Sequence, residues 1–163
     1  MNNLGLNWYQ LDEVNMLRLS KLADYGTQVM TYMARDQAVH SASEVATGLG
    51  IAAPTVSKIL KMLARKNLIA SVLGAKGGYM LARQPAEISI AEIIDAMDGP
   101  ISITECSGTS ICMRETVCAT RSNWQRINHI ILDALEKVNL AEMIVSKPQV
   151  VDRSALPARG ILV

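Results

Sequence analysis

Residues 41–67, SASEVATGLGIAAPTVSKILKMLARKN, contain two predicted helices separated by a glycine-bearing turn. Ser41 and Glu44 have the spacing of a capping box, which predicts that a short helix begins here and ends at the glycines that follow. Pro54 suits the first turn of a second helix, and Asn67 suits a left-handed residue that ends it. The apolar residues of the second helix recur at helical spacing and predict one buried face: Val56, Ile59, Leu60 and Leu63. This pattern is a helix-turn-helix.

The segments on either side extend the pattern. Before it, Ser20 is placed to cap a helix that runs to about Arg35. After it, two short apolar runs flank the glycine-rich loop 73–78, which predicts a β-hairpin. A hairpin directly after a helix-turn-helix is a wing. A second capping box, Ser89 with Glu92, begins a further helix that ends before Gly99-Pro100.

A long helix is predicted from about Arg121. Its apolar residues alternate in steps of three and four, as in the contact face of a coiled coil: Trp124, Ile127, Ile131, Ala134 or Leu135, and Val138. Asn139 with Glu142 resembles the cap of a short helix over 140–145.

These elements predict a mainly α fold, a winged helix-turn-helix with a small β-hairpin and a long C-terminal dimerisation helix. The expected organisation is a flexible extension (1–15), the winged helix-turn-helix (16–100), a cysteine segment (101–120), the dimerisation helix region (121–145) and a tail (146–163).

Composition excludes several classes of protein. The 163 residues are 50% hydrophobic and 19% charged, which is typical of a folded domain rather than a disordered chain. Apolar runs stay well short of the roughly 20 residues that a membrane helix needs. The first basic residue is Arg18, so a basic secretory leader is not expected. We therefore expect a cytoplasmic protein without a membrane partner.

Charge divides the chain into two parts. Residues 16–83 hold nine Lys and Arg against three acids, whereas residues 84–143 hold four against nine. A basic front half indicates a polyanion as partner.

The predicted second helix of the helix-turn-helix presents polar and cationic side chains opposite its buried face. The second helix of such a motif enters the major groove of DNA. We expect Thr55, Ser57 and Lys58 to contact base edges and Lys61 to contact phosphate. In the wing, Lys76 lies among glycines and suits a phosphate or minor-groove contact, and Tyr79 is expected to orient the hairpin.

Three cysteines form the other candidate site. Cys106, Cys112 and Cys118 follow one another at intervals of six residues in a segment containing Gly, Ser and Thr. Structural zinc more usually has Cys-x-x-Cys pairs and a nearby fourth ligand. Three thiolates in one pliable loop suit an iron–sulfur cluster, 2Fe–2S or 4Fe–4S, completed by a ligand from elsewhere. Two alternatives stay open: a redox thiol switch, and small buried hydrophobic residues.

Residues 16–145 resemble the winged-helix regulators of the IscR and NsrR group. The opening segment is most similar to the SUF-system branch, which regulates genes for iron–sulfur cluster assembly. The segments that carry the resemblance are LSKLADYG (19–26), LARKNLI (63–69), GAKGGY (74–79), ISI (88–90) and the Cys-x5-Cys-x5-Cys loop.

The resemblance implies a homodimer joined by the long helix, with one cluster per subunit held by Cys106, Cys112 and Cys118. In the IscR branch the fourth ligand is a histidine three residues after the last cysteine, a position that Arg121 occupies here. In the NsrR branch an aspartate early in the first helix, donated by the partner subunit, serves instead, and Asp24 matches it. Asp24 is therefore the expected fourth ligand; its alternative role is to stabilise the start of the helix.

Two positions depart from the family pattern. Leu73 stands where the family usually has an arginine just before the wing glycine, which removes an expected DNA contact. Ser57 replaces a glutamate of the IscR branch, so the preferred operator sequence should differ.

These features together predict a DNA-binding repressor of iron–sulfur assembly genes that senses through a bound cluster. One alternative is a thiol- or nitric-oxide-responsive winged-helix regulator without a stable cluster, and another is a small cluster-carrier protein. An enzyme is not expected, because the sequence has no Ser–His–acid arrangement with a supporting motif. The acidic pair Asp95 and Asp98 lies on a predicted helix whose simplest role is structural.

Overall fold

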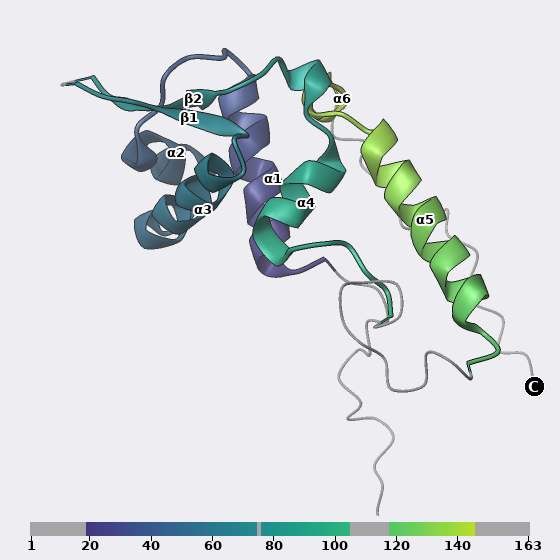
Figure 1. The fold of residues 1–163 in the computed structure, drawn as a ribbon. Helices are drawn as coiled ribbons and strands as arrows, with labels where there is room; N and C mark the ends of the chain where they lie inside the picture. Colours follow the sequence, from purple (N-terminus) through teal and green to yellow (C-terminus); the bar gives the residue numbers. More distant parts are fainter. Residues whose placement is uncertain (1–18, 75, 105–117, 146–163) are drawn as a thin grey trace, which may run out of the picture.

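The computed structural model describes residues 19–74, 76–104 and 118–145. Figure 1 shows a group of helices with a two-stranded sheet at one end and a long helix at the other. The elements are α1 (Lys21–Ala34), α2 (Ala42–Leu49), α3 (Ala53–Arg65), β1 (Ile69–Val72), β2 (Gly78–Leu81), the 3-10 turn η2 (Pro85–Glu87), α4 (Ile90–Asp98), α5 (Arg121–Lys137) and α6 (Leu140–Val145). The fold is a mainly α winged helix-turn-helix, as the sequence predicts.

The predicted helix ends are confirmed by their side-chain hydrogen bonds. At the start of α1, Ser20 Oγ accepts a hydrogen bond from the Ala23 N–H at 3.0 Å. Ser41 and Ser89 begin α2 and α4, each within a complete capping box. After α3, Asn67 takes the expected left-handed conformation with φ of 56°. These bonds satisfy backbone N–H groups that a helix leaves free at its start.

The core forms around α1, which packs against α2, α3 and α4. All four residues of the predicted stripe on α3 have 0% exposure. Met30 and Met33 of α1 are equally buried, and Met97 of α4 is 6% exposed. Gly26 lets α1 and α4 approach closely, because a β-carbon there would lie 2.7 Å from Met97 Cγ.

The wing is fixed to the connection between α1 and α2. Strands β1 and β2 are antiparallel, with Ile69 opposite Leu81. On the outer edge of β2, the Tyr79 N–H donates to the His40 carbonyl and the His40 N–H donates to the Tyr79 carbonyl, both at 2.9 Å. Gly78 makes this approach possible, since a β-carbon there would overlap the His40 carbonyl group. The hairpin is therefore held by the body of the domain and not by its turn alone.

Helix α5 connects to the winged helix through a short backbone bridge. The Ile90 N–H donates to the Val138 carbonyl at 2.9 Å, and the Leu140 N–H donates to the Ile88 carbonyl at 2.8 Å. Asn139 Oδ1 accepts from the Glu142 N–H at 3.1 Å, which confirms the predicted cap of α6. The end of α5 is thus tied to the start of α4.

Helix α5 leaves an apolar face exposed. Trp124 and Ile127 of the predicted seam are each 40% exposed, and Ile130, which the predicted seam omits, is 56% exposed. Toward the other end of the helix, Leu135 and Val138 pack partly against the core. Spacing by three residues places the exposed group along one side of α5.

Several predictions fall outside the described residues: the extension 1–15, the tail 146–163, Cys106 and Cys112. The division of the chain into five regions stays a prediction. Among the helices that the structure describes, none is both long and apolar enough to span a bilayer.

The capping glutamates predict acid-dependent stability. A backbone hydrogen bond from Ser41 holds the pKa of Glu44 below its ordinary value of 4.5. Partial burial works to raise the pKa of Glu92, but hydrogen bonds from the Ser89 backbone and the Arg83 guanidinium outweigh it, so this pKa is also lowered. Because both pKa values are lower in the folded state, this stabilisation is complete above pH about 4.5 and is lost as pH falls through the folded-state values.

We expect the chain with both Glu44→Gln and Glu92→Gln to unfold more easily than the wild type near neutral pH, and the gap to close on acidification. The measurement is the free energy of urea unfolding at a series of pH values from about 7 to about 3. A gap that stays constant across this range would show that the two carboxylates do not supply the acid dependence.

Candidate nucleic-acid interface and cysteine segment

The outer face of α3 carries the residues that the sequence assigns to DNA. Burial of the opposite stripe leaves Lys58 and Lys61 exposed, with Thr55 and Ser57 half-buried beside them. The first turn of α3 has no acidic residue and no side-chain cap. Its N–H groups and the positive end of its dipole therefore favour an approaching anion such as phosphate.

The wing places its predicted residues in two different settings. Lys76 is exposed in the turn between the strands, where its ammonium can reach a ligand. Tyr79 is half-buried, packs against the core and pairs through its backbone with His40. The expected role of Tyr79 in orienting the hairpin on DNA stays a prediction. Leu73 is 95% exposed, so its side chain contributes nothing to the packing of the wing.

A polar cluster beneath the wing was missed by the sequence analysis. The His40 side chain is 11% exposed, and its Nε2 lies 2.8 Å from Asp36 Oδ1. The His40 ring meets Tyr32 edge-on, with centroids 5.4 Å apart. The Ala38 backbone N–H and the His40 ring both bond to Asp36 and lower its pKa. The signal in the sequence was an aspartate four residues before a histidine in a short connection between helices.

Two basic residues of the front half belong to ion pairs and not to a free cationic surface. Lys66 Nζ lies 2.7 Å from Asp95 Oδ2, and Arg83 Nη2 lies 2.6 Å from Glu92 Oε1. Both acids are on α4, so the basic front half and the acidic back half partly neutralise each other. The count of charges in the sequence therefore overstates the cationic surface of the front half. A larger share of the unpaired positive charge lies on the lysines of α3 and the wing.

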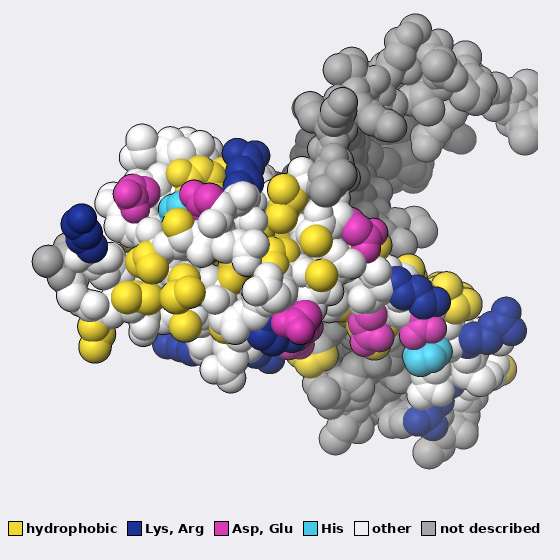
Figure 2. Space-filling model, turned by 90° about the horizontal axis from the view of Figure 1, so that it is seen from above, with side chains coloured by type: hydrophobic (Ala, Val, Ile, Leu, Met, Phe, Trp, Pro, Cys, Tyr) yellow, Lys and Arg dark blue, Asp and Glu magenta, His cyan; other side chains and the backbone are white. Residues whose placement is uncertain are grey.

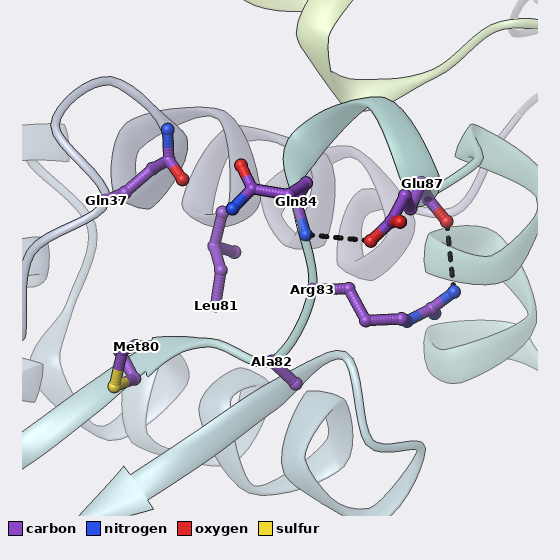
Figure 3. A pocket seen from close by; sticks show the side chains of 7 residues that line it. All are labelled: Gln37, Met80, Leu81, Ala82, Arg83, Gln84 and Glu87. Atoms are coloured by element: carbon purple, nitrogen blue, oxygen red, sulfur yellow. Dashed lines mark hydrogen bonds between the residues drawn. The ribbon is translucent and has the colours of Figure 1, made fainter.

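Arg83 lies beside a groove of about 350 Å³ at the base of the wing (Figure 3). Its Nη1 also donates to the Glu87 carbonyl at 3.0 Å, while the Glu87 carboxylate accepts from the Gln84 N–H at 3.2 Å. The Arg83 guanidinium thus bonds to the Glu87 backbone and to Glu92 of α4, and the Glu87 carboxylate bonds to the Gln84 backbone. Through its ion pair with Glu92, Arg83 joins the segment after β2 to α4.

The face drawn in Figure 2 shows hydrophobic side chains gathered toward the end of the molecule where the wing lies. Along α5 the same view shows cationic, acidic and hydrophobic side chains side by side. This face therefore does not present a continuous cationic surface.

The structure describes one of the three cysteines. Cys118 is half-buried, its Sγ lies 3.4 Å from Thr120 Oγ1, and it comes just before α5. Asp24 is exposed in the first turn of α1, where its carboxylate accepts a hydrogen bond from Gln28 Nε2 at 3.1 Å. Within residues 19–74, 76–104 and 118–145, three or more potential metal ligands do not gather at any point. The proposed ligand set includes two cysteines beyond that part, so it stays a prediction.

A helix-turn-helix with lysines on its second helix, followed by a hairpin with an exposed lysine, defines a winged-helix DNA-binding protein. The chain belongs to the Rrf2 family of iron-dependent transcriptional regulators, which matches residues 19–146. The family confirms the expectation of a transcriptional regulator and not an enzyme.

Individual relatives include both IscR proteins and a cysteine regulator. IscR of Aliivibrio salmonicida is 30% identical over 146 residues, which cover 85% of this chain and 86% of that protein. The structure of CymR, the global cysteine regulator of B. subtilis, matches with a TM-score of 0.65 at 25% identity, covering 78% of this chain and 96% of that one. T. potens IscR matches with a TM-score of 0.62 at 28% identity, covering 78% and 86% respectively.

The difference between free and paired lysines gives a direct test of the interface. We expect Lys61→Ala to weaken binding to duplex DNA and to reduce the slope of log affinity against log salt by about one, because one phosphate contact is lost. Lys66→Ala is the matched control: Lys66 is paired with Asp95, so its loss should leave the salt slope unchanged. The measurement is fluorescence anisotropy over a range of salt concentrations, and equal slopes for Lys61→Ala and the wild type would contradict the assignment.

Proposed function

We propose that the chain is a homodimeric cytoplasmic repressor of iron–sulfur assembly genes, which senses through a cluster held by Cys106, Cys112 and Cys118. The observation that carries the proposal is the even spacing of these thiols together with the position of the last one. Cys118 lies at the start of α5, the helix that leaves an apolar face exposed. A change at the thiols would therefore act on the helix that we assign to dimerisation.

The donor chemistry suits such a cluster. Thiolates are its usual protein ligands, and the cluster would supply a centre that reacts with oxygen or nitric oxide. We assign the fourth position to Asp24 of the partner subunit, because Arg121 replaces the histidine of the IscR branch. Carboxylate oxygen is a harder ligand than thiolate and would leave one iron more exchangeable. The Asp24 carboxylate is exposed on α1, and exchange of its hydrogen bond with Gln28 would let it face a second subunit.

DNA recognition is assigned to the two exposed parts of the winged helix. On α3, Thr55, Ser57 and Lys58 face base edges in the major groove and Lys61 faces phosphate. In the wing, Lys76 reaches phosphate or the minor groove, while Tyr79 sets the angle of the hairpin. Support comes from the exposure of the three lysines and from the His40–Tyr79 pairing that fixes the wing.

The homodimer is assigned to α5. Trp124, Ile127 and Ile130 form an apolar face that the described part of the chain leaves open, and a second α5 offers the same face in return. Two copies joined in this way would present two α3 helices at a fixed distance, as operators with two half-sites require.

A second candidate is a regulator that responds through its thiols without a stable cluster. It is favoured by the partly accessible Cys118 thiol and by the similarity to a cysteine regulator. A cluster carrier without DNA binding is the third candidate, and the salt dependence of DNA binding tests it.

The first test of the cluster uses protein produced without air and with ample iron. We expect brown wild-type protein with acid-labile sulfide, and colourless protein after Cys118→Ser because one ligand is lost. The Asp24→Ala variant should also be brown when prepared without air, but its cluster should decay in air several times faster than that of the wild type. The control is Asp98→Ala, which removes another carboxylate near the start of α1, one that accepts from Ser20 at 2.6 Å. If the wild type is colourless and free of sulfide but still binds its promoter normally, the thiol regulator is favoured. If the cluster of Asp24→Ala lasts as long in air as that of the wild type, Asp24 is not one of the ligands.

The second test concerns the dimer. Ile130→Lys places a charge on the exposed apolar face of α5 and should weaken self-association by about tenfold or more. Glu136→Gln changes the net charge equally on the other side of the same helix and should leave association unchanged. Sedimentation velocity at several protein concentrations distinguishes these outcomes, and a dimer as stable as the wild type after Ile130→Lys would place the interface elsewhere.

A further inference from the structure

Helix α4 is the support on which α5 is held. In the part of the chain that the structure describes, α5 packs chiefly against α4, and α4 packs in turn against α1 and α3. Helix α4 belongs to the core, because Ile93 has 0% exposure and Ile94 has 4%. The core therefore fixes α4 relative to α3. The position of α5 relative to α3 then depends on how α5 is attached to α4.

Two attachments, one toward each end of α4, hold α5 in place. At the start of α4, the Ile90 N–H donates to the Val138 carbonyl at 2.9 Å. Beyond its end, Asn128 Oδ1 accepts a hydrogen bond from the Ile103 N–H at 3.0 Å, and Asn128 Nδ2 donates to the Ile101 carbonyl at 3.3 Å. Asn128 is 8% exposed. It lies ten residues before Val138, which corresponds to about 15 Å along a helix, so the two attachments are well separated on α5.

The segment that follows α4 closes a triangle with the two helices. In Figure 1, α4 and α5 diverge from the end of the molecule where α6 lies, and the chain after α4 crosses back toward α5. Ile101 is three residues from Asp98, the last residue of α4, so this third side extends at most about 10 Å. A triangle whose short side is fixed at both ends keeps its angle. Without the Asn128 bonds this side is released, and α5 can swing about the bridge at Val138.

An amide at position 128 fixes the angle more closely than an apolar side chain would. Hydrophobic contact has no preferred direction, whereas a hydrogen bond weakens steeply when it is bent. A buried amide also costs free energy unless it is hydrogen-bonded, so positions of α5 that break these bonds are disfavoured. Asn128 therefore specifies one arrangement of α5 on α4.

Small changes of this angle have large effects along α5. Trp124 lies fourteen residues before Val138, which corresponds to about 21 Å along a helix. A swing of about 10° about the bridge would move Trp124 by about 4 Å, close to the rise of about 3.4 Å per base pair of DNA. Trp124 belongs to the exposed apolar face of α5. In a two-fold dimer built on this face, the same change would occur in both subunits.

We propose that Asn128 is a positioning residue that sets the angle between α5 and the winged helix, and with it the half-site spacing that the dimer accepts on DNA. A dimer presents two α3 helices, and their separation must match that of two half-sites. A rigid angle makes the protein bind one spacing and reject its neighbours, whereas a loose angle admits several. The proposal rests on the proposed function for the α5 dimer and for α3 as the recognition helix.

The test compares Asn128→Leu, which has a similar volume and no amide, with Asn123→Leu at an exposed position of the same helix. The probe is a duplex that the full-length wild type selects from a random pool, together with versions lengthened or shortened by single base pairs between the half-sites. Fluorescence anisotropy gives the affinity for each spacing. Sedimentation velocity and the thermal midpoint establish that each variant is a folded dimer. Hydrogen exchange of the Ile103 amide reports whether its bond to Asn128 is made.

We expect one added or removed base pair to weaken wild-type binding by about tenfold or more, since it shifts and rotates one half-site against the other. Asn123→Leu should show the same profile. In Asn128→Leu the same change should weaken binding by about threefold or less, and the Ile103 amide should exchange about ten times faster. A merely structural amide would lower the thermal midpoint or weaken binding equally at every spacing, and the shape of the profile would not change.

A wild-type spacing profile in folded, dimeric Asn128→Leu, or unchanged exchange of the Ile103 amide, would overturn the proposal. If Asn128→Leu does not fold, Asn128→Asp takes its place, because it keeps the acceptor for Ile103 and loses the donor to Ile101; its profile should lie between the other two. Failure of the proposed function has a different signature. A wild type that binds no duplex, or binds only as a monomer, removes the dimeric regulator and this proposal together, whereas equally steep profiles in the wild type and Asn128→Leu remove only the role of Asn128.

Discussion

Burial of one face of α3 is the constraint on which the other features depend. The completely buried stripe Val56, Ile59, Leu60 and Leu63 fixes the rotation of the helix about its axis, so Lys58 and Lys61 must face outward. It also fixes where the chain leaves the helix, because Asn67 turns it at once into β1. The positions of the lysines and of the wing therefore both follow from one packing requirement.

Local patterns predicted most of this fold. Caps at Ser20, Ser41 and Ser89, the stripe on α3 and the left-handed Asn67 each depend on residues a few positions apart, and each is found as expected. Contacts between distant residues were not predicted, because spacing carries no information about them. The pairing of His40 with Tyr79 and the ion pair of Lys66 with Asp95 arise only when the domain has assembled.

The candidate sites were predictable to different degrees. Exposure of Lys58 and Lys61 follows from helical periodicity. The backbone pairing of Tyr79 with His40 joins residues far apart in the sequence, so spacing could not predict it. Spacing alone could not show that the buried Asn128 side chain bonds to the backbone of Ile101 and Ile103, since 25 residues separate Asn128 from Ile103. The apolar face of α5 was also predicted only in part. The spacing of its apolar residues is visible in the sequence, but the described part of the chain does not supply the surface that would cover them.

The protein contains no phenylalanine, and thioethers fill part of the space that aromatic rings would occupy. Met30 and Met33 are fully buried where α1 meets its neighbours, and Met97 is nearly so. Conversion of such a side chain to the sulfoxide would put a polar oxygen into the core and loosen it. Cys118, by contrast, is only half-buried. The depth of these thioethers therefore protects the fold, because an oxidant in solution does not reach Met30 and Met33 while the domain stays folded.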